Sequence, residues 1–367
     1  MPTPKGPTSI RRVRPARPRH QTTYNDELDA ELSRLIKKFS VSRNADLLLE
    51  MLCAAWKMDR EYAPRLDMKI AARTLREIRF AFRLFAKHVN RRKATIFGSA
   101  RLKTDCEECR MAQRLGSVLA GHGWMVITGA GSGIMEAGHT GAGSENSIGL
   151  NIQLPWEQSV NPVIEGTDRV MTFKYFFTRK LMFVKSSHAI VYFPGGFGTQ
   201  DECFETLTLI QTGKSPIVPM VMVEAGESYW TDWMKFVKTN LLDRGMISPE
   251  DTSLFRIVQD EKEAYEEIAN FYRNFHSARY VKQWLVVRML REAPDSVVQK
   301  WNEDFKDILV NGKTSGIEKC DPFPHEQDDI PIEREDPLTK TLPRIKMLFN
   351  RRDFGRLRML IDEINKY

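Results

Sequence analysis

The chain has 367 residues, of which 42% are hydrophobic and 10% aromatic, so it can bury at least one sizeable core. It contains no run of roughly 18 uninterrupted apolar residues, which excludes an ordinary membrane-spanning helix, and its five cysteines are few and odd in number. We therefore expect a soluble cytoplasmic protein rather than a membrane protein or a disulfide-stabilised secreted domain.

The net charge of +7 is concentrated at the N-terminus. The first 20 positions contain six basic residues and no acidic ones, and without those six charges the net charge falls from +7 to +1. Segment 1–23 is rich in proline and poor in apolar residues, so we predict a disordered basic tail. Such a tail could bind RNA or another anionic surface, but we favour a solubilising extension, and we do not expect nucleic acid as a partner.

Residues 24–90 are predicted to form an N-terminal helical extension. Apolar residues between Ala71 and Val89 recur at intervals of three and four, which is typical of one face of a helix. Four arginines lie mostly off this face, namely Arg73, Arg76, Arg79 and Arg83. We interpret them as a solvated surface or as pairs for acidic groups of another subunit.

Short β-rich runs alternate with helical segments between residues 91 and 275. Strands are predicted at 94–99, 124–129, 148–154, 169–172, 189–194, 217–223 and 255–258. Helices are predicted at about 105–121, 174–186, 200–212, 230–244 and 260–274, and another from about residue 134. Because strands that alternate with helices form parallel sheets through right-handed crossovers, we predict a doubly wound, Rossmann-like α/β domain.

Residues 276–367 are predicted to be a C-terminal extension. The run YVKQWLVVRML fits either a strand or a buried helix, and residues 318–337 are rich in proline and acids, which indicates an extended segment. The final residues, DFGRLRMLIDEINKY, predict a helix capped at Asp353.

Glycines follow three of the predicted strands, at the strand ends where an α/β sheet binds its ligands. The residues are Gly98 with Ser99, then Gly129, Gly131 and Gly133, and then Gly195, Gly196 and Gly198. Glycine lets the backbone approach a ligand closely, and a helix that starts after such a turn offers free N–H groups to an anion. Together the three turns predict a site for an anionic ligand the size of a nucleotide.

Two common nucleotide motifs do not match this chain. The first turn reads GSARLK and lacks GxGxxG, and GAGSG after the second strand has a different spacing. Gly213, Lys214 and Ser215 resemble the end of a Walker A loop, but position 208 is threonine and the segment precedes a strand. We interpret Gly213 as the end of a helix, and these sequences disfavour an ordinary NAD or ATP enzyme.

Glu202 follows directly after the third glycine turn. Thr199 and Glu202 have the T-x-x-E spacing of a capping box, which would give both residues a structural role. A carboxylate beside a phosphate-binding turn could instead meet positive charge that develops in a reaction, and the spacing leaves both interpretations open. Glu205, one turn further on, could support Glu202, although an ordinary polar contact is the interpretation we favour.

The segment PGGFGTQDE, residues 194–202, resembles the PGGxGTxxE signature of the Lonely Guy (LOG) family of nucleoside 5′-monophosphate phosphoribohydrolases, some of which release cytokinin bases. The family motif pairs with an Arg-Lys on the preceding helix, matched here by Arg179 and Lys180. FGSAR (97–101) and GAGSGIMEA (129–137) match the earlier glycine segments, although many members have three consecutive glycines in the second one. The likeness covers about 91–225, and the added regions resemble the longer bacterial branch of the family. Many members carry the older label lysine decarboxylase.

The resemblance implies hydrolysis of the N-glycosidic bond of a purine nucleoside 5′-monophosphate, either AMP or a cytokinin riboside monophosphate. Glu202 and Arg179 would be catalytic, with Glu202 stabilising a cationic ribosyl transition state or activating water. The positions implied for substrate binding are Gly98, Ser99, Gly129, Gly131, Gly133, Met135, Lys180, Gly195, Gly196, Gly198 and Thr199. The resemblance also implies a homodimer, with a larger ring as an alternative. A non-catalytic nucleotide sensor or carrier on the same fold is the main rival.

We expect no metal and no other cofactor. Cys106 and Cys109 form a lone CxxC without a second pair, and the seven histidines lack the spacing of a metal site. Nothing in the sequence indicates a pyridoxal phosphate site, and the departure of a nitrogen heterocycle does not require a metal ion.

Overall fold

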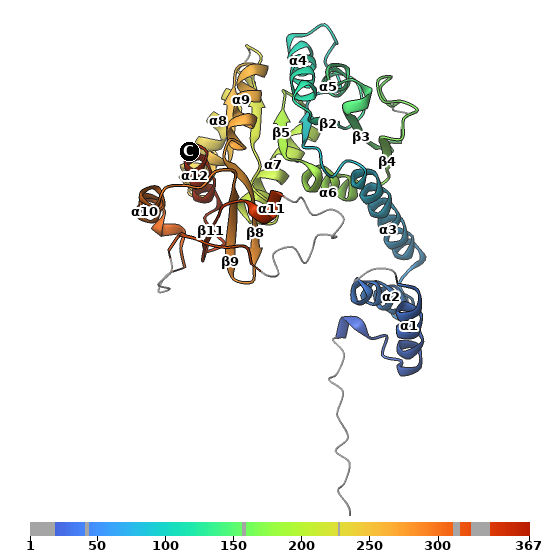
Figure 1. The fold of residues 1–367 in the computed structure, drawn as a ribbon. Helices are drawn as coiled ribbons and strands as arrows, with labels where there is room; N and C mark the ends of the chain where they lie inside the picture. The colour runs from blue at the N-terminus through green and yellow to red at the C-terminus, as the bar shows by residue number, and fades with distance from the viewer. Residues whose placement is uncertain (1–18, 41–43, 156–158, 227, 311–315, 324–337) are drawn as a thin grey trace, which may run out of the picture. The chain divides into compact units, whose positions relative to one another are not determined.

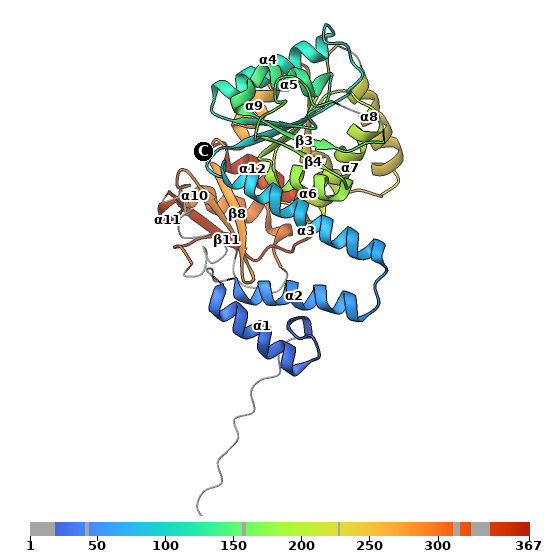
Figure 2. The ribbon, with the colours of Figure 1, turned by 90° about the vertical axis from the view of Figure 1, so that its right-hand side faces the viewer.

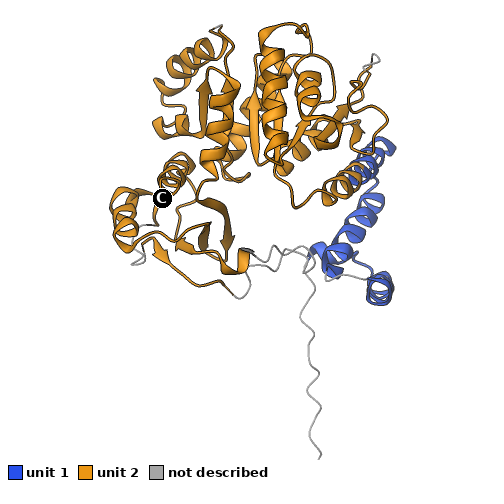
Figure 3. Cartoon of the chain, turned by 45° about the horizontal axis from the view of Figure 1, so that its top comes forward, with its two compact units in different colours: residues 1–76 blue, residues 77–367 orange. Residues whose placement is uncertain are grey.

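A computed structural model of the chain describes residues 19–40, 44–155, 159–226, 228–310, 316–323 and 338–367 (Figure 1). The chain forms two compact units, Met1–Arg76 and Glu77–Tyr367 (Figure 3). The second unit therefore starts earlier than the predicted α/β domain at residue 91, and it includes the predicted C-terminal extension. Residues 1–18 of the predicted basic tail lie outside the described residues.

The first unit is helical. It contains the 3₁₀ turn η1 (Arg19–Gln21), helix α1 (Asp26–Phe39), helix α2 (Ala45–Arg60) and the start of α3 (Arg65–Ala86). Asn25 caps α1, because its side chain accepts a hydrogen bond from the Leu28 N–H at 3.0 Å. The buried carboxylate of Asp29 accepts hydrogen bonds from Thr22 and Thr23, which fixes the residues before α1 onto that helix.

Seven parallel strands form the main sheet of the second unit, in the order β4-β3-β2-β1-β5-β6-β7. They are β1 (Lys93–Phe97), β2 (Met125–Thr128), β3 (Ser147–Ile152), β4 (Val170–Phe173), β5 (Ala189–Tyr192), β6 (Met220–Val223) and β7 (Phe255–Val258). The chain proceeds outward in opposite directions from β1 and β5, which makes their carboxyl ends the switch point of the sheet. This topology confirms the predicted doubly wound α/β fold.

Helices cover both faces of the sheet (Figure 2). They are α4 (Glu107–Gly121), α5 (Ile134–Ala142), α6 (Phe176–Ser186), α7 (Phe197–Gln211), α8 (Tyr229–Val237) and α9 (Glu261–Phe271), with short turns η2 (Ser144–Asn146) and η4 (Pro249–Leu254). Helices α4, α5 and α9 lie on one face, and α6 and α7 on the other. The predicted helix 230–244 ends as an α-helix at Val237 and continues as a π-helical turn, η3 (Lys238–Leu242). Within the described ranges, no helix combines the length and the apolar character needed to cross a membrane.

The C-terminal residues add a second, antiparallel sheet in the order β10-β11-β9-β8. Its strands are β8 (Phe275–Val281), β9 (Trp284–Met289), β10 (Glu318–Lys319) and β11 (Arg344–Met347), and the helices nearby are α10 (Asp295–Asp304), η5 (Lys306–Ile308), α11 (Leu338–Thr341) and α12 (Phe354–Ile364). The ambiguous run YVKQWLVVRML thus belongs to a hairpin rather than a helix, because Lys282 takes a left-handed conformation (φ 56°) in its tight turn. Most of the segment 318–337 that was predicted to be extended lies outside the described residues.

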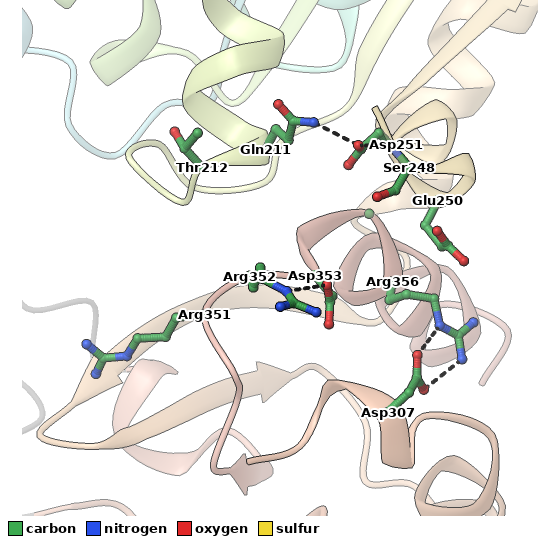
Figure 4. A pocket seen from close by; sticks show the side chains of 11 residues that line it. Gln211, Thr212, Ser248, Glu250, Asp251, Asp307, Arg351, Arg352, Asp353 and Arg356 are labelled. Carbon is green, nitrogen blue, oxygen red and sulfur yellow. Dashed lines mark hydrogen bonds and ion pairs between the residues drawn. The ribbon is translucent and has the colours of Figure 1, made fainter. Parts of the chain in front are cut away.

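Helix α12 begins after Asp353, which is its N-cap residue as predicted. Among the described residues, the Asp353 side chain makes no capping hydrogen bond, and it instead accepts one from Asn350 Nδ2 at 2.5 Å. A polar pocket of about 550 Å³ lies between the start of α12, the end of α7 and η4 (Figure 4). Arg356 pairs there with Asp307 at 2.8 Å. These polar contacts line the junction of the C-terminal helix and the α/β domain.

Candidate functional site

A pocket of about 720 Å³ opens at the switch point, where the carboxyl ends of β1 and β5 meet. Hydrogen bonds connect the three glycine turns around it. The Ser99 N–H donates to the Pro194 carbonyl at 3.0 Å, and the Ser99 carbonyl accepts from the Ile134 N–H at 3.1 Å. Ser99 in the first turn therefore links the third turn to the helix that follows the second.

Most of the predicted site residues line this pocket. They are Gly98, Ser99, Gly129, Met135, Arg179, Gly195, Gly196, Gly198, Thr199 and Glu202. Gly131 and Gly133 shape the second turn from behind: Gly131 accepts a hydrogen bond from Asn161 Nδ2 at 3.1 Å. Gly133 has a φ of 63°, and a Cβ atom there would clash with the Ser99 carbonyl, so only glycine fits.

Helix α7 begins earlier than the sequence predicted. Its N-cap is Gly196, whose carbonyl accepts hydrogen bonds from the N–H groups of Thr199 at 3.0 Å and Gln200 at 3.2 Å. The capping-box interpretation of Thr199 and Glu202 is therefore wrong, because the glycine turn itself forms the first helical turn and Glu202 lies in the second. The first N–H groups of a helix lack partners within the helix, so this start is suited to an anion.

Glu202 is buried in α7, with 6% of its surface exposed. Its Oε1 lies 3.7 Å from Lys180 Nζ, and its Oε2 has no hydrogen-bond partner among the described residues. Burial raises the pKa of Glu202 to about 7, while the nearby charges of Lys180 and Arg179 oppose the rise. A carboxyl group with a pKa near neutrality can change its protonation during a reaction, which favours a chemical role.

Lys180 is surrounded by acidic side chains of α7. Its Nζ lies 2.8 Å from Asp201 Oδ2 and also contacts Glu205 Oε2, in addition to Glu202. Glu205 therefore pairs with the same lysine that lies beside Glu202. In this arrangement Lys180 connects α6 to α7 and places a positive charge beside Glu202.

Arg179 extends from α6 into the same pocket. Its Nε donates a hydrogen bond to the Leu150 carbonyl at 2.7 Å, and its guanidinium carbon lies 5.1 Å from the centre of the Phe183 ring. Burial lowers the pKa of Arg179 to about 10, and the negative charge of Glu202 opposes this. A Cβ atom on Gly129 would clash with Arg179 Nη2 and Met135 Sδ, so Gly129 makes room for the arginine.

Residues 129–268 match a protein family described as possible lysine decarboxylase. A cytokinin riboside 5′-monophosphate phosphoribohydrolase from Mycobacterium tuberculosis is 26% identical over 168 residues, which cover 45% of this chain and 88% of the relative. Both matches agree with the resemblance of the α/β domain to the LOG family. The glycine turn, Glu202 and Arg179 line the pocket described above, and Lys180 lies beside Glu202.

The α/β domain also resembles solved structures. A structural-genomics target determined by X-ray crystallography is 23% identical, with a TM-score of 0.35, and the match covers 48% of this chain and 96% of that chain. The molybdenum cofactor carrier protein of Chlamydomonas reinhardtii is 21% identical, with a TM-score of 0.35, and the match covers 48% of this chain and 94% of that chain.

The sequence did not predict the apolar part of this pocket, which includes Phe97, Ile152, Leu154 and Phe176. Two signals could have found it. Ile152 and Leu154 come at the end of a strand next to the second glycine strand, and Phe176 lies three residues before Arg179, on the same helix face. The remaining lining residues that were missed are Ala100, Arg101, Phe197, Gln200 and Asp201.

Tyr229 of α8 supports the glycine turn from outside the signature. Its hydroxyl donates a hydrogen bond to the Gly195 carbonyl and accepts one from Gln200 Nε2 at 2.7 Å. No motif marks Tyr229, and 34 positions separate it from Gly195, so the sequence alone offered no signal for this contact.

Proposed function

We propose that the chain hydrolyses the N-glycosidic bond of a purine nucleoside 5′-monophosphate, AMP or a cytokinin riboside monophosphate, to the free base and ribose 5-phosphate. The main support is the buried carboxylate of Glu202, which lies one helical turn beyond a glycine-rich helix start at the sheet's switch point. The activity for which the mycobacterial relative is named supports the same reaction class.

The 5′-phosphate would bind at the start of α7. Gly196 and Gly198 are exposed, and within the described structure no atom lies within 4 Å of where their Cβ atoms would stand. Glycine is therefore not required there by packing, and its absence of a side chain leaves the backbone N–H groups accessible to an anion. Arg101 in the first turn adds a positive charge to the same pocket. Phosphate binding away from the bond that breaks would position the sugar.

The base would lie against the apolar wall formed by Met135, Ile152, Leu154 and Phe176. The wall is apolar, whereas the other end of the pocket is suited to an anionic phosphate. The nucleotide therefore has one favoured direction of binding.

Bond cleavage leaves positive charge at C1′ of the ribose, and ionised Glu202 would stabilise that charge or activate the attacking water. The water oxygen bonds to C1′ and the C1′–N bond breaks. Its electron pair goes to the base nitrogen, which gains the proton that the water loses. Arg179, fixed by its bond to the Leu150 carbonyl, would orient the substrate beside Glu202.

We also propose that the chain acts as a homodimer. Large apolar side chains are exposed on the helices that border the pocket, with Phe176, Phe177 and Leu181 on α6 and Phe197 and Phe204 on α7. A second copy of the chain would remove this apolar surface from water. Sedimentation equilibrium of the full chain tests this, with a monomer at micromolar concentration as the contradicting result.

The direct test incubates the protein with a panel of nucleoside monophosphates and measures free base and ribose 5-phosphate. We expect the wild-type chain to release adenine from AMP, and Glu202→Gln to bind AMP but lose turnover. Glu205→Gln is the matched control and should retain most activity, because Lys180 keeps its contact with Asp201. Tight AMP binding without base release by the wild type would favour a nucleotide carrier instead.

A further inference from the structure

Glu77 of α3 is a buried carboxylate, with 2% of its surface exposed. Its Oε1 accepts a hydrogen bond from the Lys174 backbone N–H at 2.9 Å, and its Oε2 accepts one from Thr178 Oγ1 at 2.7 Å. Lys174 and Thr178 lie on either side of the start of α6. A side chain from the helical segment before the sheet therefore holds the first turn of the helix that carries Arg179.

The start of α6 has no side-chain cap of its own. Tyr175 is the N-cap, and its side chain makes no capping hydrogen bond within the described structure. Helix N-termini leave several backbone N–H groups without helical partners and carry a partial positive charge. The carboxylate of Glu77 places a negative charge at this end. It accepts hydrogen bonds from the Lys174 N–H, just before the cap, and from the Thr178 hydroxyl, which also lies within hydrogen-bond distance of the Tyr175 carbonyl.

The same turn of α6 leads directly into the pocket. Arg179 follows Thr178 in the chain and donates to the Leu150 carbonyl, and Lys180 lies beside Glu202. A shift of this turn would lengthen both contacts, because the backbone of the turn determines where the two side chains can reach. Errors of about 1 Å in the placement of groups around a substrate can cost about a hundredfold in rate.

We propose that Glu77 is a positioning residue, which fixes the first turn of α6 and thereby the guanidinium of Arg179 and the ammonium of Lys180. The catalytic consequence of this inference rests on the proposed function. The inference gives the C-terminal part of α3 a role in positioning the candidate site. The nearby ion pair between Lys87 and Asp168, at 2.6 Å, is exposed and contributes less.

A carboxylate with a purely structural role would lower stability when removed and leave the folded enzyme unchanged. A positioning role predicts more. Glu77→Gln should reduce kcat by about tenfold or more, with a smaller effect on KM, because the phosphate-binding turn belongs to α7. The ionisation of Glu202 seen in the pH–rate profile should also move to higher pH. The charges of Lys180 and Arg179 on α6 lower the pKa of Glu202. Glu205 and Asp201 on α7 raise it, and they would keep their positions in the variant.

If Glu77→Gln does not fold, the matched pair Thr178→Val and Thr178→Ser tests the same hydrogen bond from its donor side. Valine removes the hydroxyl donor while keeping the branched shape, and serine restores the donor. We expect Thr178→Val to lower kcat severalfold and Thr178→Ser to restore at least half of the wild-type value. Asp168→Asn, which breaks only the exposed pair with Lys87, should leave kcat unchanged.

A second measurement does not depend on turnover. The buried Arg179 Nε–H, bonded to the Leu150 carbonyl, should give a slowly exchanging ¹⁵N–¹H signal that Arg179→Lys removes. Faster exchange of this signal in Glu77→Gln or Thr178→Val supports the positioning role. Absence of base release by the wild type would contradict only the proposed function. Folded variants with wild-type exchange, wild-type kcat and an unshifted pH profile would overturn the inference.

Discussion

Lys180 Nζ lies 3.7 Å from Glu202 Oε1, and the same ammonium also contacts Asp201 and Glu205. One positive charge therefore sits among three carboxylates, of which Glu202 is the most deeply buried. Lys180 opposes the effect of burial on Glu202, so this contact controls how readily the carboxyl ionises.

Lys180→Met should raise the pKa of Glu202 above its present value of about 7, because it removes a nearby positive charge and leaves Asp201 and Glu205 in place. The ascending limb of kcat/KM against pH should move upward by about one pH unit. Lys235→Met, which breaks an exposed pair with Asp232, is the control and should not move the limb. An unshifted profile in Lys180→Met would show that the two groups do not interact in solution.

The wild-type rate should depend on pH in a definite direction. If ionised Glu202 is the active form, kcat/KM rises with pH and levels off above an apparent pKa of about 7. Any residual activity of Glu202→Gln should lack this limb. A rate that falls through the same range would mean instead that the protonated carboxyl donates a proton to the departing base.

Stability should respond to pH in the opposite direction. The pKa of Glu202 is raised in the folded state from an ordinary value of 4.5 to about 7, so the folded chain holds this proton more strongly than the unfolded chain. Its contribution is complete below pH about 4.5 and is lost as the pH rises through about 7. As the pH rises from 5 to 8, the wild type should therefore lose about 2 to 3 kcal/mol in the free energy of unfolding relative to Glu202→Gln, as measured by urea titration at each pH. Equal pH dependence in both proteins would contradict the raised pKa.

The alternation of strands and helices was enough to predict the sheet, since each buried strand is a short apolar run between turn residues. The details of α7 were not predictable in this way. The sequence predicted a helix from about residue 200, with Thr199 as its possible cap, whereas the backbone of the glycine turn itself makes the first turn from Phe197. Local patterns cannot decide between such alternatives when tertiary hydrogen bonds, such as that from Tyr229 to Gly195, hold the turn.

The site itself was predictable where a signature marks it. Glu202, Arg179 and the glycines belong to contiguous motifs, and the sheet topology brings these motifs together. Glu77 was missed because a buried carboxylate on an amphipathic helix is indistinguishable, in sequence, from a solvated one. Its partners Lys174 and Thr178 lie almost a hundred positions away, where no local periodicity can reveal them.

Gly129→Ala tests the close packing around Arg179. The added methyl group would clash with Arg179 Nη2 and Met135 Sδ, so the arginine should leave its place in the pocket. We expect activity to fall at least tenfold and the free energy of unfolding to drop by about 1 to 3 kcal/mol. Gly121→Ala, at the exposed end of α4 with open space around it in the described structure, should change neither activity nor stability by much. Full activity in Gly129→Ala would argue against a fixed guanidinium.

The most direct test of the central claim is a crystal structure of the Glu202→Gln variant with AMP bound. We predict a phosphate within hydrogen-bond distance of the backbone N–H groups of residues 196–199, with the substituted side chain at position 202 facing C1′ of the ribose. A nucleotide that binds elsewhere, or a phosphate in this turn with the side chain at position 202 directed away from the sugar, would contradict the proposed chemistry.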